Sequence, residues 1–272
     1  MKFTRVLILL CVILSFSYCK KDPDSLSVIN SNSLHQKQVE LHFQVPAPAL
    51  QDSILSNDDQ QQQSSAMQKL DELISLKERV MESPDDKLWK DMKQQWKDFS
   101  LNYIGDSLTL RDGQHLTKRK LTNENAVKWA RLNIDLLKFS GEVPFGDALE
   151  VLLYGNSGFQ FPDSLLKSII YTHVFDDIYI NIIGSSSMEY QHTTGGTVKI
   201  IQDTNYPKGS EMVLKIETND VRLLNIYIRI PTWAVNPKVS YGNVKYVAYP
   251  GQYSEVSRKW SGGDELTISL KN

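Results

Sequence analysis

Cysteine is nearly absent from this sequence of 272 residues, which contains only Cys11 and Cys19. Both lie near the N-terminus, so residues 20–272 contain no thiol. A disulfide, a thiolate nucleophile and a cysteine-ligated zinc ion are therefore excluded from that part of the chain. We predict no metal site and no cofactor.

An excess of one charge is also absent, because 30 basic residues stand against 32 acidic ones and the net charge is −2. A protein that holds a nucleic acid needs a basic surface to neutralise the phosphates. The five histidines are scattered, and His173 and His192 have no partner at metal-ligand spacing. We interpret both as surface or packed side chains and predict no nucleic-acid partner.

The N-terminal hydrophobic run is too short to cross a membrane. Residues 6–14 are nine apolar residues, whereas a spanning helix needs about 20. Lys2 and Arg5 precede this run, and a short stretch leads from it to Cys19. This layout is typical of a signal peptide, so we predict that residues 1–18 are removed.

Cys19 is the predicted lipidation site, although Tyr18 stands where lipoprotein signals usually carry a small residue. The polar stretch 20–24 resembles the segment after the lipidated cysteine of Bacteroidota lipoproteins. We therefore predict a protein of the cell envelope whose partner is a membrane, held through a lipid anchor. The alternative is ordinary cleavage after Ser17, which would leave Cys19 as a stray thiol.

Residues 19–65 are rich in Ser, Asn, Asp and Gln and end in a run of glutamines. Such a composition buries too little apolar surface to offset chain entropy. We predict a lipidated flexible tether, within which residues 39–45 are a candidate for one added strand.

Residues 66–175 are predicted to form a helical domain, because apolar residues recur there at helical spacing. Ser65 and Gln68 form a capping-box pattern, and Ser83 with Pro84 indicates the start of a second helix. The expected helices cover residues 65–83, 84–103, 123–139, 145–154 and 162–173.

Residues 176–272 alternate apolar and polar residues with a period of two, which predicts strands. Regular spacing and Gly, Asn and Pro turns favour an antiparallel β-sandwich. The predicted fold class is therefore α+β, with helices followed by the sandwich. The expected strands cover residues 178–183, 197–202, 211–217, 223–230, 239–241, 244–249, 253–260 and 265–270.

Five motifs in this half occur in the order found in one enzyme family. They are residues 176–181 (DDIYIN), 202–207 (QDTNYP), 228–234 (IRIPTWA), 250–253 (PGQY) and 258–264 (RKWSGGD). Together they resemble the C-terminal region of glycoside hydrolase family 127, the β-L-arabinofuranosidase family. The resemblance implies a β-sandwich that accompanies a glycan-degrading catalytic domain.

Upstream, residues 146–156 are similar to a helix of the family's catalytic α/α toroid. The stretch 66–175 is too short for a full toroid, since helical arrays use two helices per roughly 40–50 residues. We therefore predict that the helical domain is a toroid remnant.

The family resemblance also implies a zinc-bound cysteine nucleophile held by further cysteines and a glutamate. Glu124-Asn125-Ala126 stands where the family has Glu-Thr-Cys. Glu124 therefore remains as a candidate catalytic residue, whereas Ala126 has replaced a cysteine. One carboxylate is a poor zinc site.

Other carboxylates and aromatic residues are also candidates. Asp147 and Glu150, with Glu124, could form an acid–base pair for glycoside hydrolysis, but we interpret all three as cap or surface groups. Tyr206, Trp233 and Tyr253 could stack on sugar rings. The alternative is packing in the sandwich, which we favour for Trp260.

These patterns leave three hypotheses of function. The preferred one is an envelope lipoprotein, related to glycan-degrading enzymes, with a noncatalytic carbohydrate-binding or accessory role. The second is a residual glycoside hydrolase that uses carboxylates alone. The third is a protein-interaction module of an envelope complex. An aromatic cleft favours the first, a carboxylate pair across a pocket the second, and a flat apolar patch the third.

Overall fold

The computed structural model describes residues 37–43, 57–104, 110–111, 114–115, 121–155 and 160–271. The predicted signal peptide, Cys19 and much of the predicted tether lie outside these residues. Within them, no helix is both long enough and apolar enough to span a membrane.

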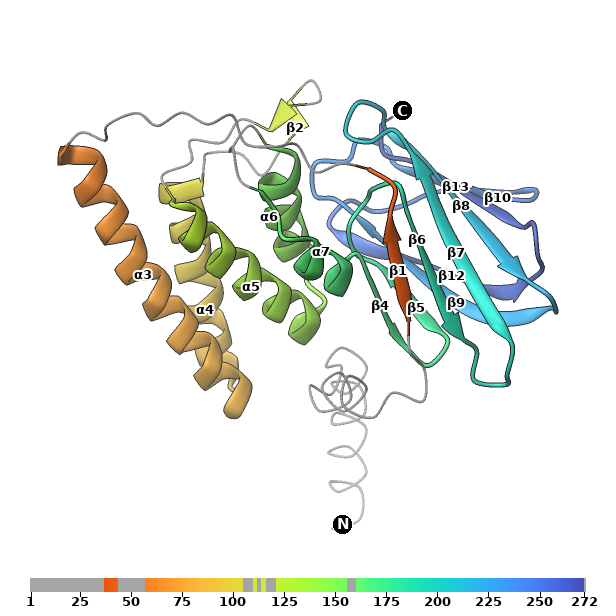
Figure 1. The fold of residues 1–272 in the computed structure, drawn as a ribbon, viewed down its shortest axis with the longest axis horizontal. Coiled ribbons are helices and arrows are strands. Elements are labelled where there is room, and N and C mark those ends of the chain that lie inside the picture. Colours follow the sequence, from red (N-terminus) through yellow and green to blue (C-terminus); the bar gives the residue numbers. More distant parts are fainter. Residues whose placement is uncertain are drawn as a thin grey trace, which may run out of the picture.

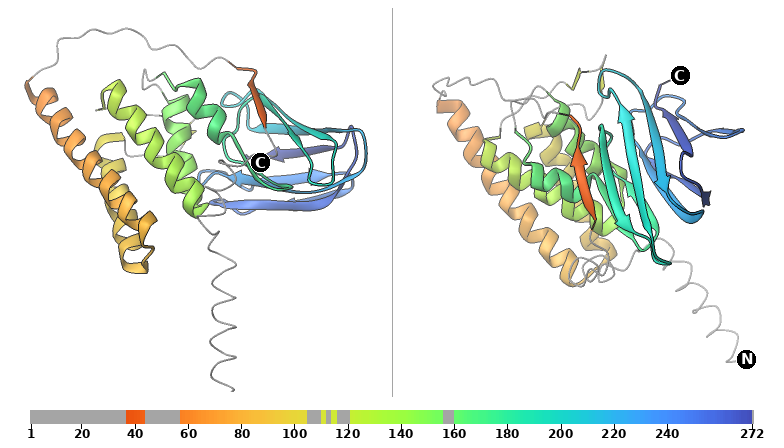
Figure 2. Two further views of the ribbon diagram at one scale, coloured as in Figure 1. Left: turned by 60° about the horizontal axis from the view of Figure 1, so that its bottom comes forward. Right: turned by 45° about the vertical axis from the view of Figure 1, so that its right-hand side comes forward.

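The described chain consists of a layer of helices beside a β-sandwich (Figure 1). Helix α3 is the outermost, and α6 and α7 lie next to the sandwich; two further views show the same order (Figure 2). The helices are α3 (Asn57–Glu82), α4 (Asp86–Phe99) with the π-helical turn η1 (Ser100–Ile104), α5 (Asn123–Ser140), α6 (Val143–Tyr154) and α7 (Asp163–Ile169).

Two predicted helix starts were wrong. Helix α3 begins at Asn57, so Ser65 lies inside the helix and the tether prediction extended too far. Helix α4 is capped by Asp85, whose carboxylate accepts from the backbone N–H groups of Lys87 and Leu88 at 2.9 and 3.0 Å. A carboxylate at this position accepts hydrogen bonds from two free N–H groups and interacts favourably with the positive end of the helix dipole.

The sandwich consists of a seven-stranded sheet in the order β1-β6-β7-β8-β13-β10-β11 and a four-stranded sheet in the order β12-β9-β5-β4. The strands are β1 (Gln38–Leu41), β4 (Tyr171–Val174), β5 (Asp177–Ile180), β6 (Ser186–Gln191), β7 (Thr197–Thr204), β8 (Glu211–Thr218), β9 (Arg222–Ile230), β10 (Lys238–Tyr241), β11 (Val244–Val247), β12 (Gln252–Trp260) and β13 (Glu265–Ser269); a short hairpin joins β2 (Leu110–Arg111) to β3 (Gln114–His115).

The α+β sandwich prediction is confirmed, with three differences in detail. Strand β4 occupies the end of the segment predicted as a helix to His173, because α7 already ends at Ile169. Strand β6 was missed, since its Ser-rich start carries little strand signal. The pair β5–β9 is parallel. The strand proposed near residues 39–45 exists as β1, which pairs with β6.

One hydrophobic core is continuous from the helices into both sheets. In the helical layer the indole of Trp96 stacks on that of Trp129 at 5.8 Å between ring centroids. The Trp96 Nε1–H also donates to Asn133 Oδ1 at 2.8 Å, and both partners are buried. The helices are therefore packed against the sandwich, and buried charged side chains lie at the boundary between them.

Candidate functional site

Arg229 occupies the boundary between the helices and the sandwich. It belongs to β9 and forms ion pairs with Asp147 and Glu150, which are one helical turn apart on α6. All three side chains are completely buried. Buried charges are tolerated only when they are paired and hydrogen-bonded, so this cluster fixes β9 on α6.

Asp147 has further partners on the loop that follows β9. Its Oδ2 accepts from the Thr232 backbone N–H at 3.1 Å and from the Thr232 hydroxyl at 2.6 Å. Gly146 makes the approach of Arg229 possible, because a Cβ there would lie 2.6 Å from Arg229 Cδ. The sequence Gly146-Asp147 thus supplies both the space and the counter-charge for the arginine.

The pKa of Glu150 is raised in this cluster. Burial raises its pKa to about 7, although the nearby Arg229 opposes the shift. It accepts from the Tyr206 hydroxyl at 3.2 Å and from the Ile183 backbone N–H at 3.4 Å. Burial likewise raises the pKa of Asp147.

The interpretation of Asp147 and Glu150 as cap and surface groups was therefore wrong. Local spacing could not reveal Arg229 as their partner, because Arg229 lies 82 positions from Asp147 along the chain. Their spacing on α6 did carry a signal, since residues three apart lie on one helix face. The hydrophobic surroundings of both residues on α6 could have indicated that this face is buried.

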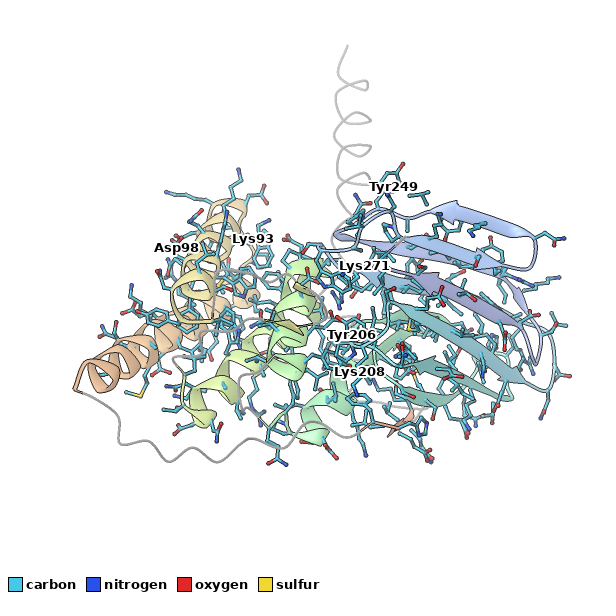
Figure 3. The ribbon with its side chains drawn as sticks, turned by 90° about the horizontal axis from the view of Figure 1, so that it is seen from above. Lys93, Asp98, Tyr206, Lys208, Tyr249 and Lys271 are labelled. Atoms are coloured by element: carbon cyan, nitrogen blue, oxygen red, sulfur yellow. The ribbon has the colours of Figure 1, made fainter. Side chains whose placement is uncertain are left out.

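The predicted sugar-binding aromatic residues surround this cluster. Tyr206 and Trp233 are stacked on each other at 6.0 Å between ring centroids and are only 7% and 9% exposed. Tyr206 lies where the helices meet the sandwich (Figure 3). Tyr253 reaches the cluster through Asn181, whose Oδ1 accepts from the Tyr253 hydroxyl at 2.6 Å and whose backbone oxygen accepts from Arg229 Nε at 2.5 Å.

Trp260, His173 and His192 all pack against or form hydrogen bonds with other parts of the protein. Trp260 is completely buried, as expected for a core residue, and donates from Nε1 to the Leu224 carbonyl at 3.2 Å. His192 is buried, and its Nδ1 accepts from the Thr194 backbone N–H at 3.1 Å. His173 has its Nδ1 3.1 Å from the Phe175 carbonyl and packs on the ring of Tyr190.

Glu124 is exposed in the first turn of α5, where Thr122 is the N-cap. Two residues further on, Ala126 is completely buried and offers no donor atom for a metal. In the part of the chain that the structure describes, no group of three His, Cys, Asp or Glu side chains could hold a metal ion. The residues present therefore do not fit the zinc centre that the resemblance implies.

Fold and boundary together define an α+β protein in which a buried arginine joins a helical layer to a β-sandwich. Residues 177–272 match the family described as beta-L-arabinofuranosidase, GH127 middle domain. The search of curated proteins gives no match. The C-terminal region is thus related to glycan-degrading enzymes of this family.

Several solved structures have a similar fold. A GH127 β-arabinofuranosidase is 17% identical with a TM-score of 0.58, over 75% of this chain and 42% of that one. A GH127 β-L-arabinofuranosidase from Geobacillus stearothermophilus T6 is 15% identical with a TM-score of 0.52, over 68% and 39%. A further glycoside hydrolase is 14% identical with a TM-score of 0.54, over 73% and 45%. The chain thus spans less than half the length of these proteins.

Proposed function

We propose that this chain is an envelope-anchored lipoprotein with a noncatalytic role in glycan use, as a carbohydrate-binding or accessory protein. The observation that carries the proposal is the state of Asp147 and Glu150, two of the carboxylates that the glycoside hydrolase alternative would use. Both are completely buried and paired with Arg229. A general acid or base must reach its substrate within hydrogen-bond distance, and these two groups face only protein.

The relationship to GH127 enzymes supports a glycan as the ligand class. The sandwich keeps the family's pattern, whereas the residues that would hold zinc are absent from the helical part, as Ala126 illustrates. A sandwich that is kept without these ligands suits a binding or accessory role. The signal-like sequence before Cys19 supports lipidation at this residue. The lipid anchor would hold this domain at a membrane surface.

The test is product formation by the full chain. The protein is incubated with arabinose-containing oligosaccharides, with and without zinc, and released sugar is measured by mass spectrometry beside the Glu124→Ala variant. We expect no release under any condition and a measurable affinity for a glycan by calorimetry. Release that disappears in Glu124→Ala would overturn the noncatalytic role and establish the carboxylate enzyme.

The anchor has its own test. Metabolic labelling with an azido fatty acid in a bacterial host is expected to label the wild-type chain and not the Cys19→Ser variant. Equal absence of label in both would overturn lipidation and favour ordinary cleavage after Ser17.

A further inference from the structure

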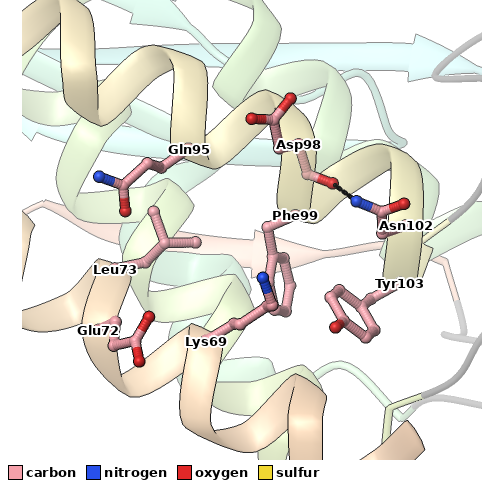
Figure 4. A pocket seen from close by; sticks show the side chains of 8 residues that line it. All are labelled: Lys69, Glu72, Leu73, Gln95, Asp98, Phe99, Asn102 and Tyr103. Atoms are coloured by element: carbon pink, nitrogen blue, oxygen red, sulfur yellow. Dashed lines mark hydrogen bonds between the residues drawn. The ribbon is translucent and has the colours of Figure 1, made fainter.

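A hollow lies on the side of the helical layer that faces away from the sandwich, between α3 and the end of α4 (Figure 4). Its volume is about 110 Å³. A closed cavity of about 150 Å³ is known to hold one six-membered ring. The hollow therefore suits part of a single small ring.

The floor of the hollow is apolar and aromatic. Leu73 and Phe99 form it and are 2% and 3% exposed. The ring of Tyr103 lies 4.9 Å from that of Phe99 and is half-buried. Because Phe99 is almost fully buried, Tyr103 is the aromatic side chain of the hollow that a ligand can reach, and an aromatic face suits the apolar face of a sugar ring.

The rim of the hollow is rich in hydrogen-bond acceptors. Glu72 uses Oε1 to accept from Gln68 at 3.2 Å, and Asp98 uses Oδ1 to accept from Gln94 at 2.9 Å. Within the described part of the chain, the second oxygen of each carboxylate carries no hydrogen bond. Two carboxylates repel an anion, whereas hydroxyl groups donate to them in charge-assisted bonds.

The amides on the rim add to the same preference. Asn102 donates from Nδ2 to the Asp98 backbone carbonyl at 2.8 Å, and Gln95 donates from Nε2 to Asp91 at 3.1 Å. The side-chain oxygen of each amide is thus left as an acceptor. Lys69 supplies a donor at the edge of the hollow.

The backbone changes its helical form at this place. Residues Ser100–Ile104 form a π-helical turn directly after α4, and Asn102 and Tyr103 of this turn line the hollow. A π-helical turn is less stable than an α-helical one and occurs frequently at functional sites. The turn sets the direction in which these two side chains leave the helix.

We propose that this hollow receives one edge of a ring of a neutral, hydroxyl-rich sugar. The proposal rests on the proposed function and gives it a site that lies outside the region matching the family. A wider depression of about 660 Å³ continues along α3 and shares Glu72 and Gln95 with the hollow. The ligand is therefore one unit of an oligosaccharide, whose next units follow this depression.

The test is isothermal titration calorimetry of the full chain with L-arabinose, D-galactose and arabino-oligosaccharides. The variant Glu72→Gln/Asp98→Asn removes both carboxylates of the rim, and both positions are exposed. The matched control, Glu78→Gln/Glu82→Gln, removes two exposed carboxylates from α3 outside the hollow. Melting curves of all three proteins establish that the fold is kept.

We expect the rim variant to bind at least about tenfold more weakly than the wild type, since each lost charge-assisted bond costs affinity. The control should bind as the wild type does. Sugar binding that is equal in the rim variant and the wild type would overturn the hollow as the site and leave the proposed function standing. Absence of binding to every sugar would overturn both the hollow as a site and the carbohydrate-binding role.

Discussion

Arg229 on β9 and Asp147 on α6 form an ion pair in which both side chains are completely buried. The pair joins the first half of α6 to a central strand of the four-stranded sheet, since β9 lies between β12 and β5. Because the two residues come from different layers, their pairing requires the correct docking of helices on sandwich. The stability of the whole fold should therefore depend on it.

Arg229→Met is expected to lower the free energy of unfolding by about 3 to 5 kcal/mol, because it leaves two buried carboxylates without a counter-charge. Urea denaturation followed by circular dichroism measures the loss. The control Arg131→Met removes an exposed arginine of α5 and should change stability by less than about 0.5 kcal/mol. Equal effects of the two substitutions would contradict a structural role of the cluster.

Gly146→Ala is expected to destabilise the protein by about 1 to 3 kcal/mol, since the new methyl group would overlap Arg229 Cδ. Helix propensity alone predicts the opposite sign, because alanine is favoured over glycine inside a helix by about 1 kcal/mol. The sign of the change in urea denaturation thus decides between the two. A stabilised variant would show that Arg229 can move aside.

The stability of the protein should depend on the ionisation of Glu150. Burial raises the pKa of this carboxyl from 4.5 to about 7, so between these values the folded protein keeps a proton that the unfolded chain has released. The stabilisation from this group is full below pH 4.5 and is lost as the pH rises through 7.

The Glu150→Gln variant has no ionisable group at this position, so it should not show this loss of stability as the pH rises. Relative to the wild type, the variant is expected to gain on the order of 2 kcal/mol between pH 5 and pH 8. Urea denaturation at a series of pH values measures the difference. Parallel profiles for the two proteins would contradict the raised pKa.

Metal removal should leave the protein unchanged. Ala126 offers no ligand atom, and residues 20–272 contain no cysteine, so neither a chelator nor added zinc is expected to shift the melting temperature by more than about 1 °C. Differential scanning fluorimetry with and without EDTA measures this. A clear rise with zinc would contradict this prediction.

The sequence predicted the strands of the sandwich well where apolar residues alternate, as in β7, β8, β9 and β12. It was less successful where the signal is local and weak. Helix α7 ends early because the following residues form a strand that pairs with β5. Helical spacing in the sequence does not reveal this pairing. The start of α3 was missed because its polar glutamines resemble a flexible linker.

Composition and motif order were enough to exclude a thiolate or cysteine–zinc centre, to predict an α+β fold and to indicate the GH127 relationship. They could do so because these features depend on which residues are present and on their local order. Tertiary structure alone decided that Asp147 and Glu150 are buried partners of Arg229, and that Glu72 and Asp98 share one hollow. The apolar neighbours on α6 could have indicated that its face is buried, but charge pairing arises between segments far apart in the chain and cannot be read from local spacing.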